Sequence, residues 1–181
     1  MKQVLIQRGE IKVVELPSPK INKGEILVAV QASTISIGTE IADIKNSGEK
    51  LYKKVAKQPK KIIDTLNYTS EMGVKNTIDF IKAKQNEYFP TGYSCSGYVV
   101  DVSPEISNFK IGQRVACAGS KYAFHSELIK VPKNLCVPLP NDINFNSAST
   151  VSLGAIALQG VRRANPTLGE NFVVIGLGFL G

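Results

Sequence analysis

The sequence predicts a mainly β fold with a helical insertion, an α+β arrangement, and three observations carry this prediction. Apolar and polar residues alternate in short runs before position 40 and again after position 90. Between 48 and 89 the apolar residues instead recur every three or four positions, and segment 146–181 changes to a helix, an apolar strand and a glycine loop. With 181 residues, 43% of them hydrophobic and 20% charged, the chain is long enough for one sizeable core.

The first predicted elements are strands. Segments 1–7 and 11–16 flank Arg8-Gly9-Glu10, where the glycine supplies the turn of a hairpin. The Pro17-Ser18-Pro19 run ends that pairing, and segment 25–33 alternates again. β structure returns downstream in four short runs bounded by Gly or Pro, at 97–102, 114–118, 125–131 and 136–139.

Helices are predicted in two places. The first is the insertion 46–89, where Pro59 and Met72-Gly73 separate three apolar groups and so predict two or three short helices. These groups are Leu51 and Val55; Ile62, Ile63 and Leu66; and Val74, Ile78 and Ile81. The second is segment 146–163, which is rich in Ala and Leu and begins with polar capping residues.

The chain closes on a strand followed by glycines, the order found in dinucleotide-binding loops. The apolar strand 171–175 precedes Gly176-Leu177-Gly178-Phe179-Leu180-Gly181. Gly176 would make the tight turn, Gly178 would let the backbone approach a pyrophosphate, and Gly181 would let a helix pack close to the strand. The loop therefore predicts NAD or NADP as cofactor, and the alternative is a glycine-rich tail of an unrelated β domain. We expect the helix and the ribose-binding acid to lie beyond Gly181, so that this polypeptide alone binds the cofactor poorly.

Several segments in order resemble the medium-chain dehydrogenase/reductase superfamily. They are 24–32 (GEILVAVQA), 38–40 (GTE), 91–102 (TGYSCSGYVVDV), 109–115 (FKIGQRV), 122–132 (YAFHSELIKVP), 135–140 (LCVPLP) and 149–160 before the glycine loop. The resemblance implies a GroES-like β barrel over 1–145, followed over 146–181 by a linking helix and the first strand of a truncated Rossmann domain. The insertion and the segments CAGSKYA and ALQGV further resemble the bi-domain, threonine-dehydrogenase-like oxidoreductases.

Zinc is not expected, because the positions of the family's metal ligands hold other residues. The first ligand position falls on Ile37 or Ser36, depending on where a one-residue insertion is placed. The family's G-H-E segment is here Gly92-Tyr93-Ser94, and the third ligand has no counterpart in 152–155. Neither hydroxyl groups nor an isoleucine replace thiolate and imidazole at a tetrahedral zinc ion.

The three cysteines and the single histidine leave two interpretations. Cys117 and His125 bracket a predicted turn, and with Cys95 and Cys136 they could form a rearranged metal site. The alternative is that the thiols are small buried core residues and that His125 is an ordinary half-buried side chain or a substrate contact. The odd, widely spaced cysteines favour reduced thiols in a cytoplasmic protein.

In the absence of zinc, three residues are candidates for the catalytic chemistry. Tyr93 stands where the ligand histidine of the family lies, so it is either a proton donor or a core residue that fills the space. Thr39 matches the family hydroxyl that relays a proton, and its alternative is a turn-capping threonine. Glu40 matches the acid beside that hydroxyl, which more often orients structure than takes part in the reaction.

Charge and composition limit the partners. The net charge is +7, and residues 45–89 hold ten lysines against five acids. This patch lacks an arginine–aromatic pattern, so a solvated helix surface explains it better than nucleic acid, although an acidic sugar or sugar nucleotide is a candidate substrate. No apolar run is long enough to span a membrane, and no secretory signal precedes the first strand.

The sequence thus predicts part of an NAD(P)-dependent, zinc-independent oxidoreductase that acts on an alcohol or carbonyl and forms a homodimer when complete. The competing prediction is a non-catalytic GroES-like domain that binds a ligand or serves assembly.

Overall fold

The computed structural model describes residues 1–48, 73, 75–76 and 87–181, and the predicted helices of the insertion fall almost entirely outside these ranges. The chain divides into two compact units. The first comprises 1–3, 15–35 and 92–181, and the second comprises 4–14 and 36–91. The expected domain boundary at 145/146 is a different division and stays a prediction.

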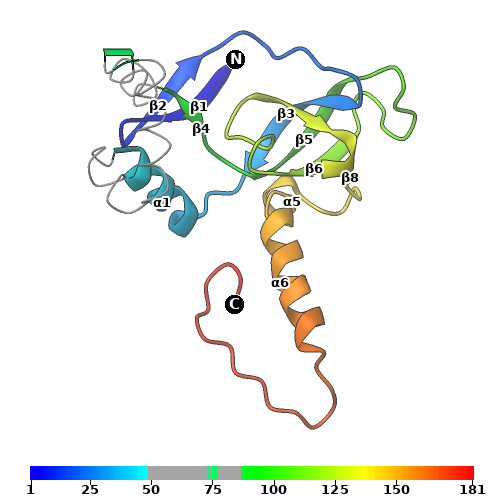
Figure 1. Cartoon of the computed structure of the whole chain (residues 1–181). Coiled ribbons are helices and arrows are strands. Elements are labelled where there is room, and N and C mark those ends of the chain that lie inside the picture. The colour runs from blue at the N-terminus through cyan, green and yellow to red at the C-terminus, as the bar shows by residue number, and fades with distance from the viewer. Residues whose placement is uncertain (49–72, 74, 77–86) are drawn as a thin grey trace. The chain divides into compact units, whose positions relative to one another are not determined.

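The first unit is built on a five-stranded antiparallel sheet. Its strands are ordered β7-β3-β5-β6-β8, so that the two longest strands, β3 and β5, lie side by side at its centre (Figure 1). The strands are β3 (Glu25–Ser33), β5 (Ser94–Val102), β6 (Arg114–Ala118), β7 (Leu128–Pro132) and β8 (Cys136–Pro138). A short 3-10 helix, η1 (Lys133–Leu135), joins β7 to β8. The predicted β structure in these segments is confirmed.

One face of this sheet forms the hydrophobic core. The residues that alternate along the strands toward that face are almost completely shielded from solvent, as the period of two requires. They include Ile26 and Val28 of β3, Cys95 and Val99 of β5, Val115 and Cys117 of β6, and Ile129 and Val131 of β7. Phe109 and Ile106, from the β5–β6 connection, also belong to the core. The opposite face carries Ser94 and Ser96, which contact the helical segment described below.

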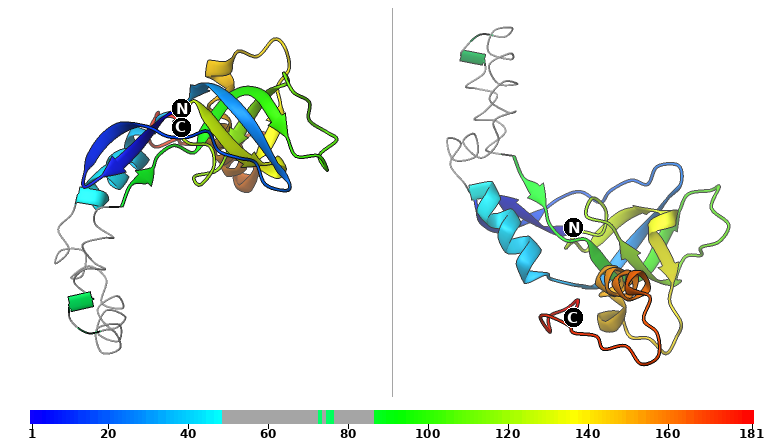
Figure 2. Two further views of the ribbon diagram at one scale, coloured as in Figure 1. Left: turned by 90° about the horizontal axis from the view of Figure 1, so that it is seen from above. Right: turned by 60° about the horizontal axis from the view of Figure 1, so that its bottom comes forward.

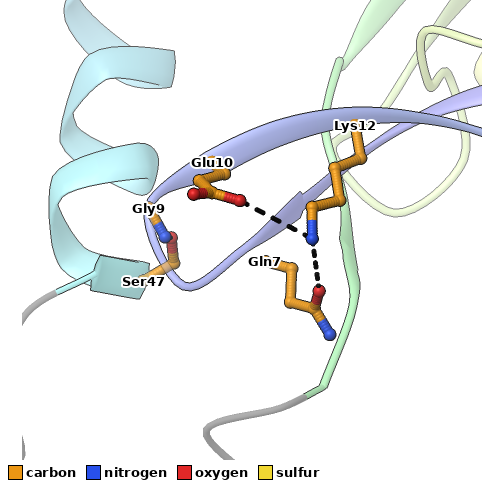
Figure 3. Close-up of polar contacts among 5 residues, drawn as sticks. All are labelled: Gln7, Gly9, Glu10, Lys12 and Ser47. Atoms are coloured by element: carbon orange, nitrogen blue, oxygen red, sulfur yellow. Dashed lines mark hydrogen bonds and ion pairs between the residues drawn. The ribbon is translucent and has the colours of Figure 1, made fainter.

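The second unit contains a small sheet and one helix. The sheet has the order β2-β1-β4, with β1 (Lys2–Gln7), β2 (Glu10–Glu15) and β4 (Phe89–Pro90). The predicted hairpin is confirmed, because Arg8 and Gly9 between β1 and β2 adopt φ values of 50° and 82°. Around this turn Lys12 Nζ bonds Gln7 Oε1 at 3.0 Å and pairs with Glu10 Oε2 at 3.6 Å (Figure 3).

Helix α1 (Ile37–Gly48) packs its end against the hairpin turn of the same unit. The backbone amide of Gly9 donates to Ser47 Oγ at 2.9 Å, and that hydroxyl donates to the Ile44 carbonyl at 2.9 Å (Figure 3). Gly9 and Gly48 approach so closely that a Cβ on Gly48 would lie 3.0 Å from the Gly9 Cα. Sequence analysis did not predict this helix, although Ile37, Ile41 and Ile44 have helical spacing.

The predicted helix over 146–163 is present but interrupted. It forms a short α5 (Phe145–Ala148) and a longer α6 (Val151–Ala164), both of which contact β5 (Figures 1 and 2). Asn144 caps α5 by accepting the Ser147 amide at 2.8 Å, and α6 ends at Asn165, which adopts the left-handed conformation with φ 47° before Pro166. None of the described helices is long and apolar enough to cross a membrane.

The prediction of a strand over 171–175 is wrong for this structure. These residues have no strand conformation and follow α6 as an extended segment (Figure 1). Val173 is 85% and Ile175 96% exposed. A strand is stabilised by hydrogen bonds to a neighbour and by burial of its faces, and none of the described strands pairs with this segment.

Candidate functional site

Tyr93 lies where the polypeptide enters β5, directly after a tightly packed glycine. Gly92 has a φ of +102°, and a Cβ at this position would fall 2.6 Å from the His125 backbone nitrogen and 2.9 Å from the Phe124 carbonyl carbon. Only glycine accommodates this conformation and this approach. The close contact fixes the backbone from which the Tyr93 side chain projects.

The phenolic hydroxyl of Tyr93 is buried and has no hydrogen-bond partner among the described residues. Such an atom is unusual, because nearly all buried polar side-chain atoms in native proteins are paired. Burying an unpaired hydroxyl costs roughly 1–3 kcal/mol relative to a paired one. The Tyr93 hydroxyl is therefore suited to meet a polar atom supplied by a ligand.

A cluster of four hydroxyl side chains lies beside Tyr93 and joins the sheet to α6; we call it the hydroxyl clamp. It consists of Thr34, Ser94, Ser149 and Ser152. Ser94 Oγ donates to the Ser149 carbonyl at 2.6 Å and accepts the Ser152 amide at 3.2 Å. Ser152 Oγ donates to the Tyr93 carbonyl at 3.1 Å.

The direction of each hydrogen bond in the hydroxyl clamp follows from counting protons. Ser149 Oγ donates its one proton to the Asn146 carbonyl at 2.8 Å. The 2.9 Å contact between the Thr34 and Ser149 hydroxyls must therefore be donated by Thr34. All four hydroxyl protons of the clamp are thus used within the protein.

Thr39 and Glu40 lie together in the first turn of α1. Thr39 is exposed and accepts from Ser36 Oγ at 3.3 Å. The Glu40 carboxylate accepts the Ser36 amide at 3.0 Å and is only 8% exposed, so it satisfies a backbone donor at the start of the helix. These two residues belong to the second unit and Tyr93 to the first, so their participation in one site stays a prediction.

The residues at the family's zinc-ligand positions do not fit a zinc ion. Ile37 is apolar and 73% exposed, and Ser36 has only a hydroxyl, which donates to Thr39 Oγ1. The position of the ligand histidine is occupied by the phenol of Tyr93, and Ser152, in the segment of the third ligand, donates its hydroxyl proton to the Tyr93 carbonyl. Zinc requires thiolate, imidazole or carboxylate donors. Within the described ranges, no group of three His, Cys, Asp or Glu side chains is arranged to hold a metal ion.

The three cysteines meet across neighbouring strands. Cys95 lies opposite Cys117 and Cys117 opposite Cys136 in the register of β5, β6 and β8, and the Cys117 and Cys136 sulfur atoms are 3.4 Å apart. The hydrogen bond with Cys117 and burial raise the pKa of Cys136. All three thiols belong to the hydrophobic core. This arrangement favours the structural interpretation of the cysteines over the rearranged metal site.

His125, the remaining member of that alternative site, is bound elsewhere. Its Nδ1 lies 2.8 Å from Ser33 Oγ at the end of β3, and the side chain is buried. A role in contacting substrate stays a prediction.

Two of the three closing glycines stand where a side chain would be strained or would meet the backbone. Gly176 adopts a φ of +94°, and a Cβ on Gly181 would fall 1.9 Å from the Gly176 carbonyl oxygen. Gly178 has open space where a side chain would be, and all three glycines are exposed. The backbone therefore turns back on itself, with the Gly181 amide donating to the Gly178 carbonyl at 3.4 Å, and the binding of a phosphate by this loop stays a prediction.

Sequence relatives of the chain are dehydrogenases. It is 28% identical over 121 residues to the (R,R)-butanediol dehydrogenase of Bacillus subtilis, a match that covers 53% of this chain and 35% of the relative. It is 24% identical over 205 residues to the sorbitol dehydrogenase of Bombyx mori, which covers 98% of this chain and 50% of the relative. The chain thus spans half or less of these relatives. No family model matches the sequence.

Solved structures show the same fold. Galactitol-1-phosphate dehydrogenase from Escherichia coli matches 91% of this chain and 46% of its own, with a TM-score of 0.65 and 18% identity. The Escherichia coli quinone oxidoreductase complexed with NADPH matches 91% of this chain and 41% of its own, with a TM-score of 0.62 and 15% identity.

The antiparallel sheet and the helix that follows it agree with the GroES-like fold of these structural neighbours. The sequence relatives and the structural neighbours are dehydrogenases and oxidoreductases, which agrees with the resemblance to the medium-chain dehydrogenase/reductase superfamily.

Proposed function

We propose that the full-length protein is an NAD(P)-dependent oxidoreductase that transfers a hydride between nicotinamide and an alcohol or carbonyl substrate without zinc. The buried, unpaired Tyr93 hydroxyl is the observation that carries this proposal. The Tyr93 hydroxyl can donate a hydrogen bond at the position where the family carries a metal ligand. The oxygen atoms around it do not suit zinc.

In this mechanism Tyr93 acts on the substrate oxygen. When bound, the nicotinamide cofactor supplies or accepts the hydride. During carbonyl reduction the phenol donates a hydrogen bond to the oxygen on which negative charge develops, and then a proton; in the reverse direction it accepts that proton. The four hydroxyls of the clamp have committed their protons, whereas the Tyr93 hydroxyl, like that of Thr91, has no hydrogen-bond partner among the described residues and can donate to a ligand.

The glycine loop would hold the cofactor. The backbone amides near Gly176, Gly178 and Gly181 would face the pyrophosphate, and the conformation of the loop excludes side chains at its first and last glycine. Thr39 stays a candidate for substrate contact on its own unit, and the Glu40 carboxylate accepts the Ser36 amide in the turn beside it.

The proposed substrate class is a polyol or a sugar derivative. Support comes from the relatives named for sorbitol and L-idonate and from the structural neighbour named for galactitol-1-phosphate. The threonine-dehydrogenase-like, bi-domain architecture is part of this proposal, and the reading frame that follows Gly181 in the gene tests it directly.

The test is a steady-state assay on the purified full-length protein with NAD and NADP against polyols, sugar phosphates and quinones, together with its zinc content by mass spectrometry. We expect turnover with less than stoichiometric zinc and no loss after chelation. Tyr93→Phe should lower kcat well over tenfold with little change in cofactor affinity. Cofactor binding without turnover on any substrate class would favour the non-catalytic ligand-binding or assembly domain instead.

A further inference from the structure

Helix α6 lacks a local cap at its start. Thr150 precedes its first residue, but the Thr150 side chain donates to the Ser147 carbonyl and caps no amide of α6. The first amides of a helix have no partner within the helix and need one from outside. For the Ser152 amide that partner is Ser94 Oγ, which lies 58 residues earlier in the chain and on the central strand of the sheet.

The same residues hold Tyr93. Ser152 Oγ donates to the Tyr93 carbonyl, so one residue of α6 is bonded both to Tyr93 and, through its amide, to Ser94. Ser94 is fully buried. Its hydroxyl also donates to the carbonyl of Ser149, which lies just before the start of α6. Two hydrogen bonds of Ser152 therefore tie the first turn of α6 to the backbone of Tyr93 and to the side chain of Ser94.

We propose that Ser94 is a positioning residue that couples the orientation of Tyr93 to that of α6, the helix that leads to the glycine loop. This inference rests on the proposed function and goes beyond it, because it assigns the link between the proton donor and the cofactor-binding segment. Hydride transfer requires the reacting atoms to be held within a few tenths of an ångström. In this chain a hydroxyl clamp provides such a link in a region where zinc-dependent relatives carry metal ligands.

Ser96 offers a matched control. It is two residues further along β5, equally buried, and donates to the Phe145 carbonyl at 2.6 Å. Its hydroxyl bonds α5 and neither Tyr93 nor α6, so Ser96→Ala removes a comparable bond without cutting the proposed link. In hydrogen–deuterium exchange of the full-length protein, Ser94→Ala should speed exchange in the first turn of α6 about five- to tenfold, and Ser96→Ala should not.

A double-mutant cycle separates positioning from plain stabilisation. Ser94→Ala should lower kcat at least fivefold in the wild-type background but less than twofold in the Tyr93→Phe background, because its effect acts through Tyr93. The KM for the cofactor should stay within twofold. Ser152→Ala, at a half-exposed site, removes only the bond to the Tyr93 carbonyl and serves if Ser94→Ala does not fold.

Each outcome decides the proposal. Equal exchange in the Ser94 and Ser96 variants, or equal losses of kcat in both Tyr93 backgrounds, would overturn the coupling. A wild-type protein without turnover would refute the proposed function, while a contrast in exchange between the two serine variants would still establish the link between Tyr93 and α6.

Discussion

Gly92→Ala is the substitution for which the structure gives the sharpest expectation. Two separate penalties apply. The φ of +102° disfavours any side chain, at about 1 kcal/mol. The added methyl group would also lie 2.6 Å from the His125 nitrogen and 3.0 Å or less from two Phe124 backbone atoms, and none of these atoms can rotate away. Overpacking of this kind costs roughly a further 1–3 kcal/mol.

Gly112→Ala separates the two penalties. Gly112 has a φ of +82°, but no atom lies within 4 Å of its added Cβ. We expect this control to lose about 1 kcal/mol in the free energy of unfolding, and Gly92→Ala about 2–4 kcal/mol. Urea-induced unfolding followed by circular dichroism measures both.

If Gly92→Ala and Gly112→Ala lower the free energy of unfolding equally, the steric contact at Gly92 contributes nothing to the loss. A further consequence is local. The backbone shift needed to relieve the contact would displace Tyr93, so Gly92→Ala should lower turnover more than its stability loss explains.

Two further predictions concern the core and its edge. Arg114 donates to the carbonyls of Pro140, Asn141 and Ile143, and its guanidinium stacks on Phe145 at 4.6 Å from the ring centroid. Arg114→Lys should therefore lower the free energy of unfolding by about 1–2 kcal/mol, which a lower melting temperature would show. An unchanged melting temperature would contradict this. The pKa of the Cys136 thiol is raised in the folded protein, so the unfolded chain loses this proton at a lower pH than the folded one. The contribution of the thiol to stability is therefore complete below the ordinary thiol pKa of about 8.5. It declines above that pH by about 1.4 kcal/mol per pH unit. Cys136→Ala should reduce this decline in urea titrations between pH 8 and 10, and an equal slope in both proteins would show that the thiol does not contribute.

Local sequence patterns predicted most of the β structure for identifiable reasons. The hairpin at Arg8-Gly9 depends on a left-handed turn that glycine favours, and the alternation over β3 reflects one buried face. Helix α1 was missed because it buries only Glu40, so that Ile37 and Ile41 do not form the core-facing stripe by which amphipathic helices are recognised.

The candidate site was predictable only in part. The position of Tyr93 followed from its place in the Gly92-Tyr93-Ser94 motif, but the unpaired state of its hydroxyl depends on atoms distant in the chain. No local pattern identified Thr34 or Ser149 as neighbours of Ser94. Sequence separations of 115 residues for Thr34 and Ser149 and 58 for Ser94 and Ser152 leave no local pattern that could reveal these bonds.

Side-chain type and local backbone preference were sufficient to predict most strands of the two sheets and the helix that follows the larger sheet. Only the tertiary structure decided that the three cysteines meet, that Ser94 caps a distant helix and that segment 171–175 does not form a strand. These outcomes depend on which segments pack together, and a strand or a cap exists only when its partner lies within hydrogen-bonding distance.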